Sequence, residues 1–495
     1  MLIKKTKSLC PECLKVIEAN ITEEEGKVML EKTCPEHGFF KDIYWSDVEL
    51  YRRAQKFIHE GKGVSNPHTH RDKGCPFDCG ICDEHKTTTI LANIDLTNRC
   101  NMHCPICFAD TSQEYLYEPS FEEIVQMLEN LRAEEPVPCK AVQFSGGEPT
   151  VRDDLPAIIE KARQLGFRHV QIATNGLKLA ESVEYCKTLR DAGLNTIYLQ
   201  FDGVTPEVYE KTRGFNAWPV KEKAIKNCEQ AGASSICLVP TLVKGINDGQ
   251  VGDIIGYAFD HRETIRAVNF QPISFAGRLD YEDLVDMRLT IPDFMKLVEE
   301  QTQGQVGVDD FFTVPAVAPV SYLVEALTEK PQIEMTCHFA CGTATYVFKD
   351  GDDLVPITRF IDVEKMMKYL EEISIESIST LKKPIIGAKL FNKLRQCVDN
   401  DKKPEYLNIT KMLTDILLGN SYLDEFSYEA VLIGCMHFQD AYNFDLERVQ
   451  RCAIHYALPD GRIIPFCPYN TVHRKSFERE YAQERGTLKI KETIS

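Results

Sequence analysis

The sequence predicts an α/β fold in which helices surround a parallel sheet, with small metal-binding segments on either side of it. Strand-like and helix-like runs alternate from residue 88 to about residue 278, which is typical of right-handed βαβ units. Hydrophobic residues make up 43% of the chain and charged residues only 27%, so a large core can form. In this architecture the chemistry lies at the carboxyl ends of the strands. We therefore expect a barrel-like sheet with its functional residues at one end.

The length, charge and cysteine content limit the class of protein. A chain of 495 residues is long enough for about two to four domains. A net charge of −18 disfavours nucleic acid or an anionic membrane surface as an electrostatic partner. No apolar run reaches the length of a membrane-spanning helix, and the first residues lack the apolar core of a signal peptide, so we expect a cytoplasmic protein. In that reducing compartment, clustered thiols among the 19 cysteines are expected to bind metals rather than form disulfides.

Residues 1–60 form the first expected unit, a small metal-binding module. Residues 27–34 and 38–45 alternate like strands, and a helix is expected over about 47–60. Two pairs of ligands, in which the two members of each pair are separated by two residues, are typical of a tetrahedral mononuclear site. This spacing does not distinguish zinc from a rubredoxin-like iron. The expected ligands are Cys10, Cys13, Cys34 and His37.

Residues 61–87 are expected to be a linker that carries the first of two similar cysteine motifs. In this motif three cysteines follow the spacing C-x3-C-x2-C, and the same spacing recurs shortly afterwards. Three thiolates spaced in this way can wrap around one face of a cubane cluster, leaving the fourth iron open. Two iron–sulfur clusters are therefore expected. The first motif contains Cys75, Cys79 and Cys82, and the second contains Cys100, Cys104 and Cys107.

Residues 88–315 are expected to form the core barrel. The second cysteine motif and the segment SGGEP each follow a predicted strand, which places them at the expected active end of the sheet. The expected strands are 88–97, 141–147, 169–176, 196–203, 235–243 and 267–274, and the expected helices include 121–135, 155–166, 181–193 and 220–232.

The second motif, on the first loop of a βα barrel and followed by SGGEPT, resembles the radical S-adenosylmethionine (SAM) superfamily over about 190 residues. The resemblance implies a partial (β/α)6-type barrel in which Cys100, Cys104 and Cys107 bind a catalytic [4Fe-4S] cluster. Its open iron would hold the methionine moiety of SAM, and reductive cleavage of SAM would give a 5'-deoxyadenosyl radical. A chance arrangement of buried cysteines is the alternative, and the Gly-Gly-Glu segment argues against it.

The resemblance also implies residues that contact SAM. Gly146 and Gly147 would let the backbone approach the ligand closely, and Glu148 would offer a carboxylate to the SAM ammonium group. Ile106 would lie against the adenine. In the family, residues that follow later strands contact the ribose and the carboxylate of SAM. A role in a turn or a helix cap is the alternative for these residues. The matching residues of this chain are Asn175, Asp202 and Arg213.

The first cysteine motif is expected to hold an auxiliary cluster, because no Gly-Gly-Glu segment of its own follows it. Such a cluster could relay electrons or bind a reaction intermediate, and structural stapling is the alternative. The sequence does not indicate its fourth ligand.

Residues 316–495 are expected to form a C-terminal α+β domain with a helical insertion over 361–430. Its cysteines, with a DG-x-x-x-P-x-C segment, resemble the SPASM-like auxiliary-cluster extension of many radical SAM enzymes. Buried free thiols are the alternative. With this third cluster, the expected cofactors are SAM, three [4Fe-4S] clusters and one mononuclear iron or zinc. The expected C-terminal ligands are Cys337, Cys341, Cys452 and Cys467, with Cys435 as a substitute candidate.

The layout of the whole chain resembles archaeal tetraether lipid synthases, whose relatives were earlier grouped with pterin-methylating radical SAM proteins. The resemblance rests on CPEC…CPEHG, GCPFDCGIC, NRCNMHCPICF and RCAIHYALPDGRIIPFC. It implies that the substrate is an archaeal isoprenoid diether lipid and that the reaction joins two unactivated sp3 carbons. It also implies a low-potential electron donor such as a ferredoxin, and transient contact with the membrane surface. No nucleic-acid partner and no transmembrane segment are expected.

Other reactions remain open at this point. The leading alternative is a radical SAM C-methyltransferase that acts on a reduced hydroxymethylpterin in methanopterin biosynthesis. A SPASM-type peptide-modifying maturase follows, and a non-enzymatic iron–sulfur electron carrier is least favoured. Lipid coupling requires a long apolar tunnel that reaches the cluster, whereas a pterin requires a small pocket with polar edge contacts and aromatic stacking. The sequence alone shows neither.

Overall fold

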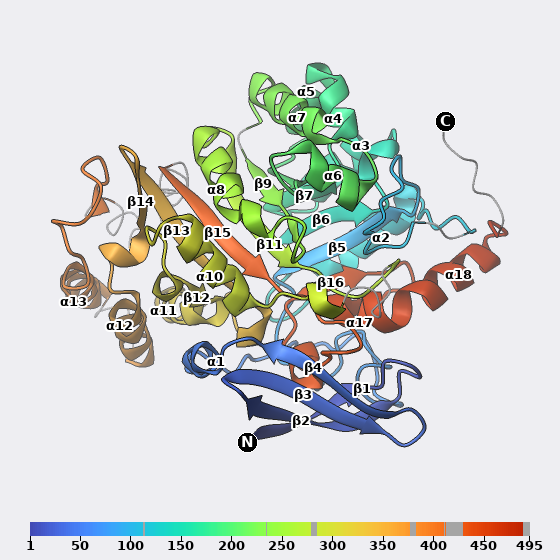
Figure 1. The fold of residues 1–495 in the computed structure, drawn as a ribbon, viewed down its shortest axis with the longest axis horizontal. Coiled ribbons are helices and arrows are strands. Elements are labelled where there is room, and N and C mark those ends of the chain that lie inside the picture. The colour runs from blue at the N-terminus through green and yellow to red at the C-terminus, as the bar shows by residue number, and fades with distance from the viewer. Residues whose placement is uncertain are drawn as a thin grey trace.

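The computed structural model describes residues 1–495 except 112–113, 234, 279–284, 377–382, 410, 412–428 and 489–495. Figure 1 shows a small antiparallel sheet from the N-terminus, drawn in blue, which lies against a large α/β unit. The large unit contains both the barrel and the C-terminal strands, so it forms the framework of the functional site.

The N-terminal sheet has four strands in sequence order, each antiparallel to the next. The two predicted strands are confirmed, the predicted helix ends at Gln55 instead of near residue 60, and two earlier strands complete the sheet. Asp47 begins the helix, because its side chain accepts hydrogen bonds from the N–H groups of Glu49 and Leu50. The elements are β1 (Leu2–Leu9), β2 (Val16–Glu24), β3 (Lys27–Cys34), β4 (Gly38–Trp45) and α1 (Val48–Gln55).

The predicted alternation of strands and helices in the core is confirmed, and neighbouring core strands are parallel. The core strands are β5 (Leu91–Thr97), β6 (Ala141–Gly146), β7 (His169–Thr174), β8 (Thr196–Gln200), β9 (Ile236–Val239), β10 (Thr241–Leu242) and β11 (Ile265–Pro272). The helices are α2 (Phe121–Arg132), α3 (Leu155–Gln164), α4 (Leu177–Glu181), α5 (Val183–Asp191), α6 (Pro206–Arg213), α7 (Trp218–Gln230), α8 (Val251–Asp260) and α10 (Ile291–Gln301).

Strands from the C-terminal third of the chain extend both edges of the core sheet. β15 (Ala430–Met436) pairs in parallel with β11, and β16 (Ile454–Ala457) pairs in parallel with β5. This pairing satisfies backbone groups that an open barrel would leave exposed at its edges. The expected C-terminal α+β segment therefore shares its sheet with the barrel. The outer strands are antiparallel: β12 (Phe312–Thr313), β13 (Gly342–Asp350), β14 (Asp353–Pro356) and β17 (Ile463–Pro465).

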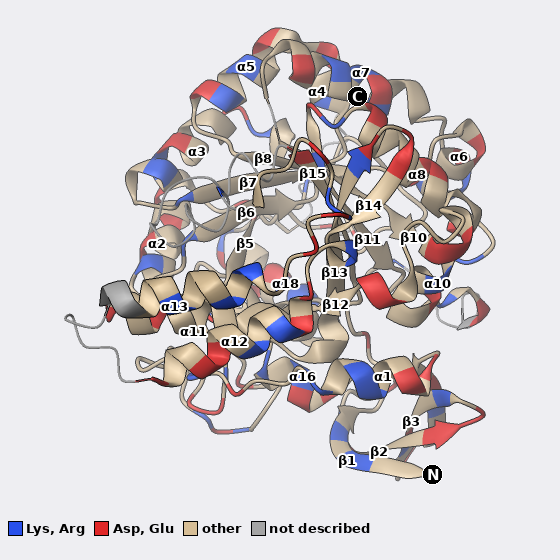
Figure 2. Cartoon of the chain, turned by 90° about the vertical axis from the view of Figure 1, so that its left-hand side faces the viewer, with Lys and Arg blue, Asp and Glu red and all other residues tan. Residues whose placement is uncertain are grey.

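Within the range of the expected helical insertion, 361–430, the structure describes two longer helices, and a third helix precedes this range. Three helices pack side by side at one edge of the large unit, visible at the lower left of Figure 2. Their shared core includes Met367, Leu370, Ile373 and Leu390, which are buried. Residues 377–382, 410 and 412–428 of the expected insertion lie outside the described residues. The helices are α11 (Ala318–Thr328), α12 (Val363–Ile375) and α13 (Lys383–Arg395).

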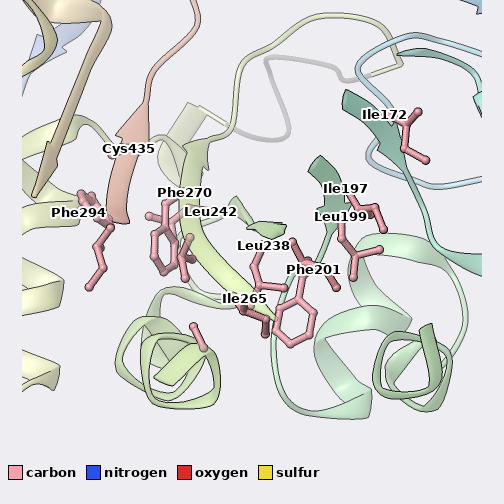
Figure 3. Close-up of a cluster of buried hydrophobic side chains, with 14 of the residues drawn as sticks. Ile172, Ile197, Leu199, Phe201, Leu238, Leu242, Ile265, Phe270, Phe294 and Cys435 are labelled. Atoms are coloured by element: carbon pink, nitrogen blue, oxygen red, sulfur yellow. The ribbon is translucent and has the colours of Figure 1, made fainter. Parts of the chain in front are cut away.

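Side chains alternate between the two faces of the core sheet, as the period of two in a strand requires. The outward-facing side chains form an apolar layer against the helices; Figure 3 shows Ile172, Ile197, Leu199 and Phe201 in this layer. The inward-facing side chains line the barrel interior and include many polar groups. The apolar layer stabilises the barrel, which leaves the interior available for ligands.

Charged side chains lie mainly on the outer helices, and Figure 2 shows Lys and Arg mixed with Asp and Glu there, while the core strands carry few charges. Among the described residues, no helix combines the length and the apolar character that a bilayer crossing requires.

The N-terminal sheet is fixed to the large unit by polar contacts with the loop before α16 (Leu446–Gln450). The hydroxyl of Thr6 donates to Asp445 at 2.6 Å, and that of Tyr44 donates to the same carboxylate at 2.9 Å. His338, Asp445 and Glu447 lie close enough to hold a metal ion. The Nζ atom of Lys4 lies 3.5 Å from Asp445 and 2.6 Å from Glu447, so a lysine supplies positive charge to this group.

Candidate functional site

A cavity of about 570 Å³ lies at the carboxyl ends of the core strands. Residues from the second cysteine motif, the Gly-Gly-Glu segment and the inner face of the sheet line it. The structure thus brings together most of the residues that are predicted to bind the SAM cluster or to contact SAM. They are Cys100, Cys104, Cys107, Ile106, Gly146, Gly147, Glu148, Asn175 and Arg213.

The Gly-Gly-Glu segment is joined to the cysteine loop through backbone atoms. The N–H of Gly147 donates to the Thr97 carbonyl at 2.7 Å, and the N–H of Glu148 donates to the Arg99 carbonyl at 2.8 Å. Gly146 has a φ of +125°, and a Cβ atom there would lie 2.2 Å from the Thr97 carbonyl oxygen. No side chain fits at such a distance. The glycines therefore allow this segment to pack directly on the loop that carries the cysteines.

Glu148 is buried, and hydrogen bonds fix the orientation of its carboxylate. Oε1 accepts from the N–H of Thr150 at 3.1 Å and from the hydroxyls of Thr150 and Thr174 at 2.6 and 2.7 Å. Oε2 accepts from the N–H of Asn175 at 2.7 Å. Burial raises the pKa of Glu148, although these hydrogen bonds act in the opposite direction. A carboxylate held in this way at a cavity wall is suited to pair with a cationic ligand.

Arg213 and Asp202 form a buried ion pair next to the cysteine loop. Nε and Nη2 of Arg213 lie 2.5 and 2.8 Å from the Asp202 carboxylate, and Nη1 donates to the Ile106 carbonyl at 3.0 Å. Burial raises the pKa of Cys104, and the positive charge of Arg213 opposes this effect. Asp202 itself is fully buried. It therefore positions Arg213, and Arg213 is the member of the pair that lines the cavity.

Asn175 links the end of β7 to the cysteine loop. Its Nδ2 donates to Asn101 at 2.7 Å, and its Oδ1 accepts from the N–H of Leu177 at 3.0 Å at the start of α4. The buried Lys221 donates to the Asn175 carbonyl at 2.5 Å and to Gln200 at 2.7 Å. Burial lowers the pKa of Lys221 to about 7. Lys221 lies within the helix predicted over 220–232, and no local motif marks it as part of the site.

A chain of amide side chains, which is not among the predicted site residues, runs along the inner face of three adjacent strands. Nε2 of Gln143 donates to Asn93 at 2.6 Å, and Nε2 of Gln171 donates to Gln143 at 2.5 Å. The signal was present in the sequence, because polar residues alternate with apolar ones in NID of β5, QFS of β6, YLQ of β8 and NFQ of β11. Strands with helices on one side and a filled core on the other would carry apolar residues at both faces. This alternation therefore indicates a polar interior.

Further polar groups continue this surface around the interior. The hydroxyl of Tyr198 accepts hydrogen bonds from Asn269 at 2.5 Å and from Gln271 at 2.7 Å. Asp95 accepts from Ser145 at 2.8 Å and pairs with Arg474 at 2.6 Å. All six of these residues line the same cavity.

Aromatic rings form another part of the cavity wall. The rings of Phe438 and Phe466 are stacked with centroids 4.2 Å apart, and Phe108 stacks on Phe466 at 5.5 Å. Tyr456 lies 5.3 Å from Phe466. The cavity thus combines amides, a carboxylate and aromatic faces with the cysteine motif.

The first cysteine motif lies at a second, smaller cavity. Cys75, Cys79 and Cys82 line it, together with His85. A hydrogen bond with Cys75, burial and the charges of Cys75 and Cys82 all raise the pKa of Cys79. Metal binding would displace the thiol protons from such a group.

The expected C-terminal cysteines also come together, from segments that are distant in the sequence. Burial raises the pKa of Cys467 to about 11, and the charge of Cys341 adds to this effect. The pKa of Cys337 is raised by burial and by both Cys341 and Cys452. Cys435, the substitute candidate, lies in β15 within the hydrophobic core. The C-terminal ligand set, Cys337, Cys341, Cys452 and Cys467, stays a prediction.

The N-terminal ligand set is preformed. The side-chain ligand atoms of Cys10, Cys13, Cys34 and His37 all lie within 4.8 Å of one another. Cys13 and Cys34 have sulfur atoms 4.0 Å apart, and Nδ1 of His37 lies 3.5 Å from the Cys34 sulfur. Burial acts to raise the pKa of Cys34, but hydrogen bonds from Glu36 and His37 outweigh it and lower the pKa to about 6. This geometry fits one tetrahedral ion.

Comparisons with known proteins identify two regions and one relative of nearly full length. Residues 94–258 match the radical SAM superfamily, and residues 2–46 match the HMPTM N-terminal zinc ribbon domain. The chain is 54% identical over 488 residues to the 7,8-dihydro-6-hydroxymethylpterin dimethyltransferase of Methanocaldococcus jannaschii. The matched region covers 97% of this chain and 96% of that protein.

Two other similarities are confined to part of the chain. The GTP 3',8-cyclase of Limosilactobacillus fermentum is 32% identical over 198 residues, covering 39% of this chain and 58% of the cyclase. The crystal structure of Streptococcus suis SuiB bound to its precursor peptide covers 44% of this chain and 46% of SuiB, with 15% identity and a TM-score of 0.37.

The full-length relative corrects the expected reaction. The expected coupling of two diether-lipid chains by a tetraether lipid synthase is contradicted, because this relative is named as a pterin dimethyltransferase, which was the leading alternative. The amides Asn93, Gln143 and Gln171 lie among apolar side chains on the cavity wall and offer polar edge contacts, which a lipid chain would not use. The expected SAM and [4Fe-4S] cofactors are confirmed by the family, and the additional cysteine groups fit further metal sites. The chain is a radical SAM enzyme and belongs to the same family as the Methanocaldococcus jannaschii pterin dimethyltransferase.

Proposed function

We propose that this chain is a radical SAM methyltransferase that adds methyl groups to carbon atoms of 7,8-dihydro-6-hydroxymethylpterin. The observation that carries the proposal is the identity of 54% over 97% of the chain to an enzyme with this name. Because the similarity extends over 97% of the chain, it is not confined to the SAM-binding core.

The described residues divide into a SAM side and a substrate side. We propose that Cys100, Cys104 and Cys107 hold the catalytic cluster. When bound, cluster and SAM together supply the 5'-deoxyadenosyl radical that removes a substrate hydrogen. On the SAM side, Glu148 offers its fixed carboxylate to the ammonium group, and Arg213 offers its guanidinium to the carboxylate. Asn175 and Ile106 complete this side of the cavity, and Asp202 keeps Arg213 in place.

The barrel interior provides the substrate side. A pterin presents hydrogen-bond donors and acceptors along one edge and two flat ring faces. Amide side chains both donate and accept, so Asn93, Gln143 and Gln171 can match such an edge without carrying charge. Phe438 and Phe466 offer aromatic faces for stacking.

The other metal groups receive supporting roles in this proposal. The C-terminal set, Cys337, Cys341, Cys452 and Cys467, holds an auxiliary cluster, as does the first motif, and both relay electrons from a low-potential donor such as a ferredoxin. The N-terminal set holds a structural zinc or iron, because four protein ligands leave no open position.

The proposal is tested by anaerobic incubation of the full chain with 7,8-dihydro-6-hydroxymethylpterin, excess SAM and a one-electron reductant that supplies two electrons per methyl group. One SAM is cleaved to methionine and 5'-deoxyadenosine, and a second donates its methyl group and leaves as S-adenosylhomocysteine. We expect 5'-deoxyadenosine together with a pterin product heavier by one or two methylene units in mass spectrometry. The Cys104→Ala variant should yield neither product. The proposal fails if SAM is cleaved while the pterin stays unmodified, or if anaerobically isolated protein retains a bound isoprenoid lipid and no pterin.

A further inference from the structure

The cavity at the first cysteine motif contains a fourth side chain that can bind a metal. His85 lines this cavity with Cys75, Cys79 and Cys82, and it is only 8% exposed. The spacing continues the motif as C-x3-C-x2-C-x2-H. A turn in which the N–H of His85 donates to the Cys82 carbonyl at 3.1 Å folds the histidine back towards the cysteines.

The hydrogen bonds of His85 determine which ring nitrogen can bind a metal. Nε2 lies 2.7 Å from the carbonyl oxygen of Cys452 and 3.1 Å from the hydroxyl of Thr87. A carbonyl oxygen only accepts hydrogen bonds, so Nε2 carries the proton. In a neutral imidazole the lone pair is then on Nδ1. Metal-binding histidines typically donate their other N–H to a backbone carbonyl or a carboxylate in this way.

A buried chain of hydrogen bonds reinforces this tautomer. Nε2 of His85 also lies 3.1 Å from Nε2 of His455, and Nδ1 of His455 lies 2.9 Å from the hydroxyl of Thr89. That hydroxyl donates to the carboxylate of Glu134 at 2.5 Å. Each donor in the series points towards Glu134, which is completely buried. The carboxylate at the end of the chain therefore favours the proton on Nε2 of His85.

Two carboxylates also line this cavity, and both are engaged elsewhere. Asp78 accepts hydrogen bonds from the N–H groups of Asp72 and Gly74, both at 2.6 Å, and so stabilises the loop before the motif. Glu84 is paired with Arg71 at the surface. Imidazole is also a better ligand for iron than a carboxylate in a site built from thiolates.

We propose that Nδ1 of His85 is the fourth protein ligand of an iron–sulfur cluster held by Cys75, Cys79 and Cys82. Such a cluster has a protein ligand on every iron, so it transfers electrons and does not bind substrate or an intermediate. A neutral imidazole in place of a thiolate leaves the cluster less negative, which raises its reduction potential. The carbonyl of Cys452 that holds His85 belongs to an expected ligand of the C-terminal cluster, which brings the two cluster sites into direct contact.

The test uses the full chain with Cys100→Ala, Cys104→Ala and Cys107→Ala, which removes the SAM cluster and any nitrogen from SAM. This parent protein is prepared with ¹⁵N-labelled histidine, reduced, and measured by pulsed electron paramagnetic resonance at the signal of the reduced clusters. We expect a strongly coupled histidine nitrogen. His85→Cys should retain iron and sulfide, lose this coupling and show a more negative reduction potential.

His473→Gln is the matched control. His473 is 9% exposed and lies 2.9 Å from the carbonyl of Pro76 within the same motif, but it does not line the cavity. Its replacement should leave both the nitrogen coupling and the potential unchanged. A histidine coupling that persists in His85→Cys would overturn the proposal. So would a parent protein without any coordinated histidine nitrogen, and this second result decides the question even if the cysteine variant does not fold.

Discussion

Replacement of Asp202 by asparagine tests whether a buried ion pair organises the SAM side of the cavity. Asp202 is completely buried, and it lies 2.5 and 2.8 Å from two nitrogens of Arg213. Asparagine keeps the size of the side chain but removes its charge, so Arg213 remains as an unpaired buried cation. Breaking a buried pair in this way costs about 3–5 kcal/mol, whereas an exposed pair contributes about 0–1 kcal/mol.

The assay is urea unfolding of the anaerobically prepared protein, followed by circular dichroism. We expect Asp202→Asn to lose about 3–5 kcal/mol of unfolding free energy. Asp191→Asn is the control, because Asp191 pairs with Arg190 at 2.7 Å while its side chain is 64% exposed. This control should lose less than about 1 kcal/mol.

A double variant, Asp202→Asn with Arg213→Met, separates charge from packing. Without the unpaired cation, it should recover much of the lost stability, but it should bind SAM poorly because the guanidinium is absent. An unfolding free energy of Asp202→Asn within about 1 kcal/mol of that of the parent protein would contradict this role of the buried pair. A double variant that is no more stable than Asp202→Asn would contradict it as well.

Three further predictions follow from the same structure. Gly146→Ala should destabilise the chain by about 1–3 kcal/mol or more, since its Cβ would meet the Thr97 carbonyl, whereas Gly249→Ala, with open space around it, should be nearly neutral in the same unfolding assay. Gln143→Leu should weaken pterin binding, measured by fluorescence titration, by about 5–100-fold through loss of the amide chain, and an unchanged dissociation constant would argue against a pterin at this wall. Burial raises the pKa of Glu134 from 4.5 to about 7, so the folded chain keeps a proton that the unfolded chain releases. The unfolding free energy should therefore fall with rising pH between these values, relative to Glu134→Gln, by up to about 1.4 kcal/mol per pH unit, and parallel pH profiles would contradict this.

The core strands and helices could be predicted from the sequence because they depend on local periodicity. The cysteine motifs and the Gly-Gly-Glu segment were equally accessible, since a thiolate cluster loop requires fixed short spacings and a glycine with positive φ marks a close backbone approach. The same local signals placed Cys10, Cys13, Cys34 and His37 in one site, which the structure brings within 4.8 Å.

The tertiary structure decided the features that depend on residues far apart in the chain. Asp202 follows a strand end, as a SAM ligand would, but the burial of its carboxylate against Arg213 gives it a positioning role. The alternation within single strands indicated polar groups in the interior, but only the structure showed that Asn93, Gln143 and Gln171 from neighbouring strands join into one hydrogen-bonded chain. Likewise, His85 follows the first motif directly in sequence, yet only its contact with the carbonyl of Cys452, 367 residues away, shows which nitrogen is free to bind a metal. The sequence determined which groups are available for the chemistry, because their spacing is local; the fold determined their roles, because hydrogen bonding and burial depend on the residues that the folded sheet brings together.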